Sequence, residues 1–528
     1  MSLVSSINIA QQALAVNQAA ITVTSNNIAN IDNENYSKLR VNLAESVNYT
    51  PSAGNAISVA NSLSGVKMTN VERYANSYLQ KYYWSENSTY NYLNQYTTIA
   101  ANIEDLVNEL NDTGLSKALD KFYTAVDSLN DNPSDITARQ SYLSAAENLC
   151  STFNNYSQSL SDIQSSLVGD YNVPGDIDNS EIAGYTENVN TLLDQLATVN
   201  FDIIKTNSGE TSSSALKDQR DAIISKLTEL IPVEVQENDN GTMNVSLGNH
   251  KLVTGKNVVG YLNAVTGSET EPAVIRIIDP KDSTNVLASN VNEDIDAGKI
   301  GAILDACGSD PSKLTVNGVL AGLNTLASSF AEIMNTIQLG DPENDNSVAM
   351  CMTADGKSIQ ASTNSIFVSD STTNLSTGIT AANIQINSNV ISDPYQISAA
   401  RLTETQYTDF VATGKHSTDI GNNSNSTIMV ESRNTTYTGV GTLGTATIEG
   451  YLSNLVLDTG KKVESLNSDF KNQGLILTEV ESNLSAATGV NLDEELTDLI
   501  KFQRAYQAAA RLFSVCNELM DSLMTLGK

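Results

Sequence analysis

Apolar residues recur at alternating steps of four and three at both ends of the chain. This spacing places one apolar stripe on a helix, and a repeat of 3.5 residues is the one that coiled coils use. The N-terminal stripe comprises Leu3, Ile7, Ala10, Leu14, Asn17, Ile21, Thr24 and Ile28, and the C-terminal stripe comprises Leu499, Phe502, Tyr506, Ala509, Phe513, Cys516, Met520 and Leu523. The sequence therefore predicts a helix at each end that packs against other helices.

The first of these helices carries no charged side chain. No Asp, Glu, Lys or Arg occurs from Leu3 to Ile31, although the whole chain has a formal net charge of -32. Its other positions are Ser, Asn, Gln and Thr, which form hydrogen bonds without like-charge repulsion when identical copies pack together. This pattern indicates an assembly surface, although periodicity alone is equally compatible with a buried terminal helix. The predicted subunit-interface residues are Leu3, Ile7, Leu14, Ile21, Ile28, Leu492, Leu496, Leu499, Phe502, Tyr506, Phe513, Met520 and Leu523.

Between the ends, helical and β patterns succeed one another. Helices are predicted over residues 71–130, 135–167, 180–204, 215–230, 314–337, 447–485 and 491–524, with prolines at 133, 174 and 232 as stops. Asn491 is a predicted N-cap for the last helix, with Glu494 completing a capping box. Alternating residues on either side of the turn 238–241 are typical of a β-hairpin, and further strands are predicted at 273–278 and within 347–425.

These elements predict an α+β multidomain fold, because 528 residues are too many for one hydrophobic core. The N- and C-terminal helices pair as a coiled coil and an elongated helical bundle, with β-rich inserted domains. The predicted domains are a terminal coiled coil (1–35 and 490–528), a helical rod (36–230, 298–340 and 445–489), a β-rich segment (231–297) and a β-rich inserted domain (341–444).

Charge and hydropathy restrict the partners. With 29 Lys and Arg against 61 Asp and Glu, the surface repels phosphate backbones and anionic lipid, so we expect no nucleic acid as a partner. No stretch approaches the roughly 20 apolar residues of a membrane span, and membrane insertion is not expected. No basic residue precedes Lys38, so the sequence predicts no secretory signal and another export route.

The sequence offers little for catalysis or metal binding. The four cysteines form no CxxC pair and are predicted to be small core residues, and only two histidines occur. Residues 439–444 satisfy GxGxxG, but no apolar strand precedes them, so we predict a loop. Residues 356–358 imitate the end of a P-loop, but Cys351 occupies the place of its first glycine. We predict no enzyme, no cofactor and no metal site.

Both ends of the chain carry signatures. Residues 25–30 (SNNIAN) with 36–38 (YSK) resemble the N-terminal signature of the bacterial flagellar rod, hook and hook-associated proteins. Residues 489–495 (GVNLDEE), with QxAYQ at 503–507, resemble the C-terminal signature of the hook-associated members, and stretches near 132–140, 216–221 and 384–394 agree. The motif residues are Asn26, Asn27, Ile28, Ala29, Asn30, Tyr36, Gly489, Val490, Asn491, Asp493, Glu494, Glu495, Gln503 and Tyr506.

One departure concerns a turn. The family usually shows Thr-Pro-Gly where this chain has Asn33-Glu34-Asn35. We expect the turn to survive, because asparagine tolerates left-handed backbone angles.

The resemblance implies a structural protein of the bacterial flagellum, secreted and extracellular, at the hook–filament junction. It implies a ring of about eleven copies joined by their terminal helices, the hook protein below, and a second hook-associated junction protein above. It also implies type III export and a cytoplasmic chaperone on the C-terminal helix. Two alternatives remain open: a paralogous hook or rod protein, and a surface-binding or enzymatic β domain carried on a flagellar scaffold.

Overall fold

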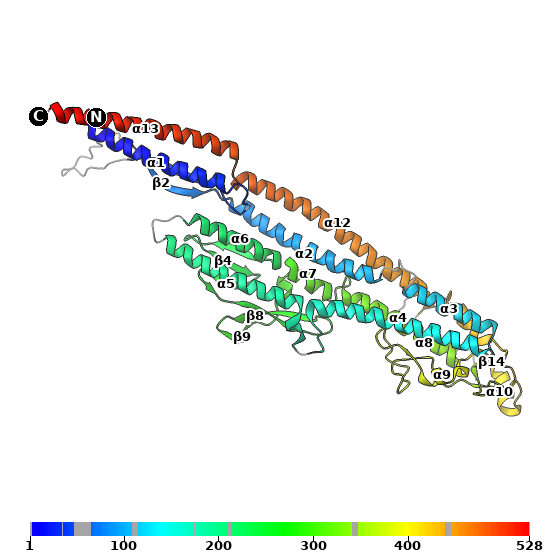
Figure 1. Cartoon of the computed structure of the whole chain (residues 1–528). Helices are drawn as coiled ribbons and strands as arrows, with labels where there is room; N and C mark the ends of the chain where they lie inside the picture. The colour runs from blue at the N-terminus through cyan, green and yellow to red at the C-terminus, as the bar shows by residue number, and fades with distance from the viewer. Residues whose placement is uncertain are drawn as a thin grey trace.

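The computed structural model describes residues 3–33, 35–46, 65–107, 114–173, 175–207, 213–340, 347–438 and 445–526. The molecule is long and narrow, and both ends of the chain lie at the same end of it (Figure 1). Long helices run along most of its length, and small sheets lie against them. This arrangement confirms the predicted α+β fold with paired terminal helices.

The end that holds the chain termini is built from four elements, which we call the terminal domain. They are α1 (Leu3–Ala29), β1 (Leu39–Glu45), β2 (Val66–Arg73) and α13 (Leu492–Leu526). Helices α1 and α13 run antiparallel side by side, and the antiparallel β1–β2 hairpin packs on α1. The hairpin was not predicted, because only Val41 and Val71 mark its inward side and a bulge between Asn42 and Leu43 interrupts the alternation.

Eight helices form the rod. They are α2 (Ser77–Val107), α3 (Leu115–Asp131), α4 (Ile136–Val168), α5 (Glu181–Asn207), α6 (Ser214–Leu230), α7 (Gly298–Cys307), α8 (Val316–Leu339) and α12 (Ile448–Thr488). Helix α12 packs along α2, where the rings of Tyr90 and Phe470 have their centroids 5.2 Å apart. The six helices predicted from 135 onward begin and end within about three residues of the observed bounds, within the usual error of such boundaries.

Two antiparallel sheets lie beside α5. The first contains β3 (Glu234–Glu237), β4 (Met243–Leu247), β5 (His250–Thr254) and β6 (Asn257–Val258), and the second contains β7 (Tyr261–Thr266), β8 (Ala273–Asp279) and β9 (Asp282–Ala288). The predicted hairpin is the β3–β4 pair. Asn200 on α5 holds the first sheet, since its side chain donates to Met243 O and accepts from Met243 N.

The end of the molecule opposite the termini, which we call the head, combines short strands with helices. Its strands are β10 (Val348–Met352), β11 (Ile359–Ala361), β12 (Phe367–Val368), β13 (Gln385–Ile386), β14 (Ala400–Leu402), β15 (Tyr437–Thr438) and β16 (Thr445–Ala446). Its helices are α9 (Ser388–Ser392), α10 (Glu404–Thr413) and α11 (Ser424–Ser432). The expectation of a β-rich region here was too simple. Helix α11 escaped prediction because it buries polar residues, Asn425, Ser426 and Ser432, so it lacks an apolar stripe.

One apolar core runs through the rod, both sheets beside α5 and part of the head. It begins at Trp84, includes Phe122, Phe330 and Phe367, and ends at Val463. A small satellite core in the head joins Met350, Ile359, Ala400 and Leu402. No described residue of the terminal domain belongs to either core. The division into four domains stays a prediction.

The four cysteines are buried and unpaired, as predicted. Over the described ranges, no helix is long and apolar enough to cross a membrane. Within the same ranges, no cluster of His, Cys, Asp and Glu could hold a metal ion.

Candidate functional site: the terminal domain and its joint to the rod

The signature residues from the two ends of the chain meet where the terminal domain joins the rod. We call this place the joint. The end of α1, residues 36–38, the end of α12 and the start of α13 converge there. Residues that are more than 450 positions apart in sequence therefore form one site.

Asn27 is the centre of the joint. Its side chain is buried, and its amide nitrogen donates to Leu39 O at 2.9 Å and to the Glu495 carboxylate at 3.0 Å. Its amide oxygen accepts hydrogen bonds from Tyr36 Oη at 2.8 Å and from Leu39 N at 3.0 Å. Both donors and both lone pairs are thus used, which is the condition under which a buried amide is tolerated.

Lys38 neutralises the acidic start of α13. Its ammonium lies 3.0 Å from Glu494 Oε2 and 2.9 Å from Glu495 Oε1. Burial alone would lower the pKa of Lys38, but hydrogen bonds to Glu495 and Glu494 outweigh burial and raise that pKa. Its backbone N also donates to Thr488 O at 2.8 Å, the last residue of α12. Lys38 therefore links α12 to α13 and balances the charge of the buried Glu495.

Tyr36 donates to Asn27 and must stay protonated to do so. Burial, and then the negative charges of Asp218 and Glu495, raise the pKa of Tyr36 to about 12. The phenol therefore remains a donor at every physiological pH.

Gly489 and Asn491 shape the break between α12 and α13. The Gly489 N donates to Ser485 O at 2.7 Å, and a Cβ at Gly489 would lie 2.4 Å from that oxygen, so only glycine fits. The Asn491 side chain accepts from Asp493 N at 3.0 Å and Glu494 N at 3.3 Å, which confirms the predicted N-cap. The predicted capping box did not anticipate that the Glu494 carboxylate pairs with Lys38.

The turn between α1 and β1 forms, but for a different reason from the one expected. Asn33 and Asn35 do not have positive φ angles. Instead, Asn35 N donates to Asn33 Oδ1 at 3.2 Å, and Tyr36 N donates to Asn33 O at 2.9 Å. Asparagine replaces the usual Thr-Pro-Gly through a side-chain turn.

Sequence reasoning missed the ionic contact between the terminal domain and the rod. Arg73, at the end of β2, places Nε 2.6 Å from Asp218 and an Nη 2.8 Å from Asp221, both on α6. Burial raises the pKa of Asp218 in spite of Arg73. The stretch 216–221 had been singled out only as family-like, and no pattern in it names a partner 145 residues away.

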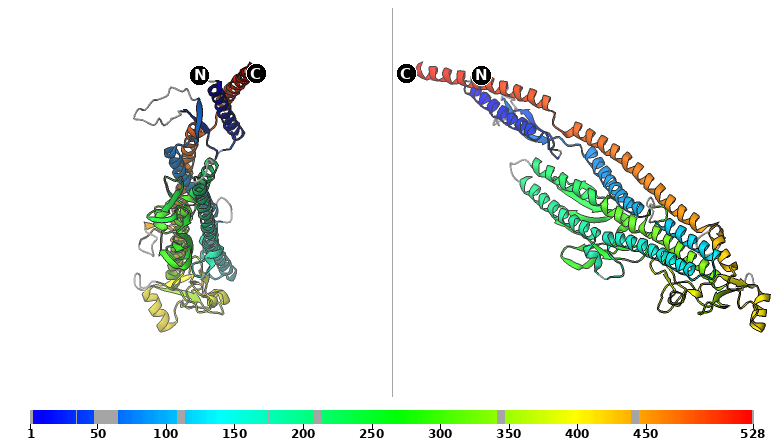
Figure 2. Two further views of the ribbon diagram at one scale, coloured as in Figure 1. Left: turned by 90° about the vertical axis from the view of Figure 1, so that its left-hand side faces the viewer. Right: turned by 45° about the vertical axis from the view of Figure 1, so that its right-hand side comes forward.

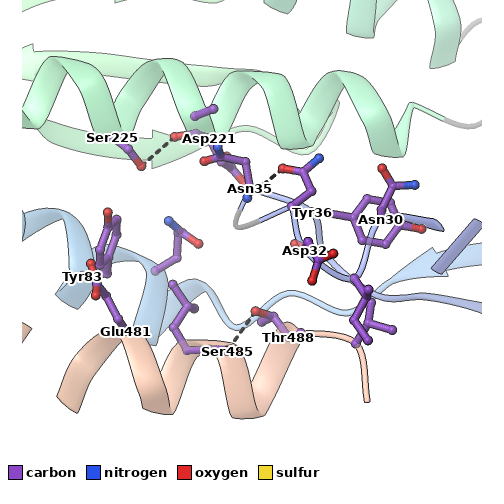
Figure 3. Close-up of a pocket in the computed structure, with 18 of the residues that line it drawn as sticks. Asn30, Asp32, Asn35, Tyr36, Tyr83, Asp221, Ser225, Glu481, Ser485 and Thr488 are labelled. Carbon is purple, nitrogen blue, oxygen red and sulfur yellow. Dashed lines mark hydrogen bonds between the residues drawn. The ribbon is translucent and has the colours of Figure 1, made fainter. Parts of the chain in front are cut away.

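A polar cavity of about 600 Å³ lies beside this contact (Figure 3). Residues 30–37 line one side, α6 lines the second with Asp221 and Ser225, and α12 lines the third with Glu481, Ser485 and Thr488.

The predicted interface residues fall into two groups. On α1, Leu3, Ile7, Leu14, Ile21 and Ile28 are half-buried, as are Leu499, Phe502, Phe513 and Met520 on α13. The others, Leu492, Leu496, Tyr506 and Leu523, are exposed. The two stripes therefore cover each other only in part, and contacts with other subunits stay a prediction. Of the remaining motif residues, Asn26, Ala29 and Gln503 are also exposed.

Sequence reasoning also missed a second apolar row on α13. Leu512, Val515 and Leu519 are 47%, 51% and 48% exposed, and they follow one another at steps of three and four. Leu523 continues the row. We call Leu512, Val515, Leu519 and Leu523 the exposed row.

Helix α13 also extends past α1. From the Asn27–Glu495 contact, α1 runs back about 36 Å to Leu3, whereas α13 runs on about 46 Å to Leu526, at 1.5 Å per residue. Both views of Figure 2 and Figure 1 are consistent with α13 reaching farther than α1. The last two turns of α13, including Leu523 and the 69% exposed Met524, have no cover from α1.

The motifs that imitate nucleotide sites do not form them. Residues 356–358 lie in the tight turn between β10 and β11, where Thr353 N and Gly356 N close local hydrogen bonds, and a strand rather than a helix follows. The GxGxxG at 439–444 lies outside the described residues.

Comparison with known proteins agrees with this architecture. A family model described as "Flagellar hook-associated protein FlgK helical domain" matches residues 100–345, and one described as "Flagellar basal body rod FlgEFG protein C-terminal" matches residues 483–526. The second range contains the joint and all of α13.

Relatives match over nearly the whole chain. Flagellar hook-associated protein 1 of Bacillus subtilis is 26% identical, with 98% of this chain and 96% of the relative covered. The protein of the same name in Salmonella typhimurium is 24% identical, with 98% and 99% covered. A solved structure of the flagellar hook junction protein FlgK from Burkholderia pseudomallei shares the fold with a TM-score of 0.55 at 14% identity, covering 76% of this chain and 99% of that one.

Paired terminal helices, a signature-built joint and a helical rod define an axial protein of the bacterial flagellum. Within that class, the chain belongs to the flagellar hook-associated protein 1 family. It is a structural protein of the extracellular flagellum, and its relatives are not enzymes.

Proposed function

We propose that this protein joins the flagellar hook to the filament by polymerising as a ring through its terminal helices. The observation that carries the proposal is the exposed row on α13 together with the uncovered end of that helix. An apolar side chain gains roughly 1.5 to 3 kcal/mol when it is fully buried, and these residues gain it only when another subunit covers them. A ring of about eleven copies would provide such cover on each subunit.

The same surface suits the partners expected above and below. The hook protein and the second hook-associated junction protein would each meet the ring through helices of the terminal domain. Before export through the type III apparatus, a cytoplasmic chaperone would cover the C-terminal helix, because exposed apolar surface of this kind promotes aggregation. In the free chain, α1 and α13 are expected to open readily, since their pairing leaves much of both stripes uncovered.

The near full-length match to hook-associated protein 1 favours the junction over the paralogous hook or rod role. Antibody labelling of intact flagella, viewed by electron microscopy, tests the choice. We expect label in a single band between hook and filament. Label distributed along the hook, or confined to the rod, would contradict the proposal.

A second measurement tests polymerisation itself. Negative-stain images of the purified chain at high concentration should show rings or short tubes, and a chain that ends before α13 should show neither. A full-length chain that stays monomeric under all these conditions would refute assembly through the terminal helices.

A further inference from the structure

The joint lacks the apolar packing that makes the rest of the molecule rigid. The continuous apolar core begins at Trp84 and ends at Val463, and no described residue of the terminal domain belongs to it. Within the described ranges, α1 and α13 pack on each other and on the β1–β2 hairpin, and neither packs along a rod helix. Interdigitated apolar side chains are what fix the relative position of two elements, so the joint is weakly fixed.

Cavities occupy the space where such packing would be. Besides the cavity of about 600 Å³ in Figure 3, one of about 820 Å³ opens between β2, the start of α2 and α6. Another of about 440 Å³ separates the end of α1 from α6. Polar side chains line most of the first cavity, so water can fill it without an apolar surface being exposed.

Two short segments connect the bodies. The chain leaves the hairpin through residues 74–76, which are exposed, and it leaves α12 through residues 489–491. The second segment holds Gly489, where α12 breaks before α13 begins. Short connections at the ends of elements are where hinge motions usually concentrate.

A single cation makes the ionic contact across the gap. Arg73 pairs with Asp218 and Asp221 of α6, and all three side chains are at most 12% exposed. A bidentate ionic contact of this kind is strong and directional, but it involves one residue of the terminal domain. The contact can hold one orientation, and its loss leaves little else to hold it.

We propose that the terminal domain is hinged on the rod at residues 74–76 and 489–491, and that Arg73 latches it in the orientation seen here. The hinge would let the coiled coil tilt while the rod keeps its shape. This inference concerns the isolated chain, so it can fail while the junction assignment stands, and the reverse.

Spin-label distances in the full-length monomer test the hinge. One pair spans the joint, with labels at Lys226→Cys on α6 and Ala508→Cys on α13, and a second pair lies within the rod, at Lys226→Cys and Ser151→Cys. All three positions are exposed, and the buried native cysteines are checked with an unsubstituted blank. We expect Arg73→Met to broaden the distance distribution of the spanning pair and to leave that of the rod pair unchanged.

Arg433→Met is the matched control. Arg433 also pairs with two carboxylates, those of Asp120 and Glu449, but it lies within the rod and head. It should not affect the spanning pair. A milder variant, Asp218→Asn, should broaden that pair less than Arg73→Met and guards against misfolding. If the spanning pair is as narrow as the rod pair and Arg73→Met does not broaden it, the hinge is refuted. A broad spanning pair that Arg73→Met does not change refutes the latch.

Discussion

At the scale of single residues, the joint depends on groups that few other side chains could replace. Asn27 needs an amide because its nitrogen donates twice and its oxygen accepts twice. Aspartate would have no donor for Leu39 O and would face Glu495 as a second carboxylate. The family signature at 26–30 therefore has a physical reason that the sequence alone does not reveal.

We predict that Asn27→Asp opens the terminal domain. Lost hydrogen bonds and a like-charge contact should cost at least about 2 kcal/mol locally. Hydrogen exchange measured by mass spectrometry should become faster over residues 3–45 and stay unchanged in the rod. The neighbouring Asn26→Asp is the control, because Asn26 is exposed. Equal exchange in the two variants would contradict the role assigned to Asn27.

Tyr36 should make the joint sensitive to alkali. The folded-state pKa of about 12 lies above the usual value of 10.0, so the folded state binds the proton more tightly than the unfolded state. The stability that Tyr36 contributes is complete below pH 10 and is lost as the pH rises through about 12.

Comparison with Tyr36→Phe isolates this effect. The variant should be less stable than the wild-type chain near pH 8, by about 1 kcal/mol for the lost hydrogen bond. The difference should shrink between pH 10 and 12, measured by urea unfolding followed by hydrogen exchange at 3–45. The other tyrosines with raised pKa values, such as Tyr92 and Tyr123, are common to both chains. A difference that stays constant with pH would show that Tyr36 does not titrate as described.

At the scale of elements, apolar periodicity predicted the long helices closely and the short elements poorly. Helices such as α4 and α12 repeat a buried stripe over many turns, so the pattern is strong. The hairpin β1–β2 has a bulge, and α11 buries polar residues, so neither shows the period of its own type. The contact of Arg73 with α6 depends on tertiary packing, which no local pattern encodes.

The two faces of α13 should respond differently to substitution. Leu512 and Leu519 are about half exposed, so Leu512→Asp with Leu519→Asp should leave the thermal unfolding of the monomer nearly unchanged while abolishing assembly. Phe513 packs toward α1, and Phe513→Ala should lower the stability of the α1–α13 pair by about 1 to 3 kcal/mol. Circular dichroism and sedimentation velocity measure the two effects. If the double Asp variant destabilises the monomer as much as Phe513→Ala does, the exposed row already has a partner within the chain.

At the scale of the whole molecule, charge is distributed unevenly. Residues 1–76 and 489–528 contain eight of the 29 basic residues and ten of the 61 acidic ones. Residues 77–488 therefore carry a net charge of -30, while the terminal segments are close to neutral. Copies that meet through their terminal domains bring acidic rods side by side, and their repulsion opposes the apolar gain at the exposed row.

Assembly should accordingly strengthen with ionic strength. The Debye length falls from about 10 Å at 0.1 M salt to about 3 Å at 1 M, so repulsion between neighbouring rods is progressively screened. Light scattering should show that the concentration needed for assembly falls as sodium chloride is raised. Sodium sulfate at equal ionic strength is the control, because sulfate also strengthens apolar association. If chloride has no effect and sulfate alone promotes assembly, the apolar row decides the equilibrium and rod repulsion does not.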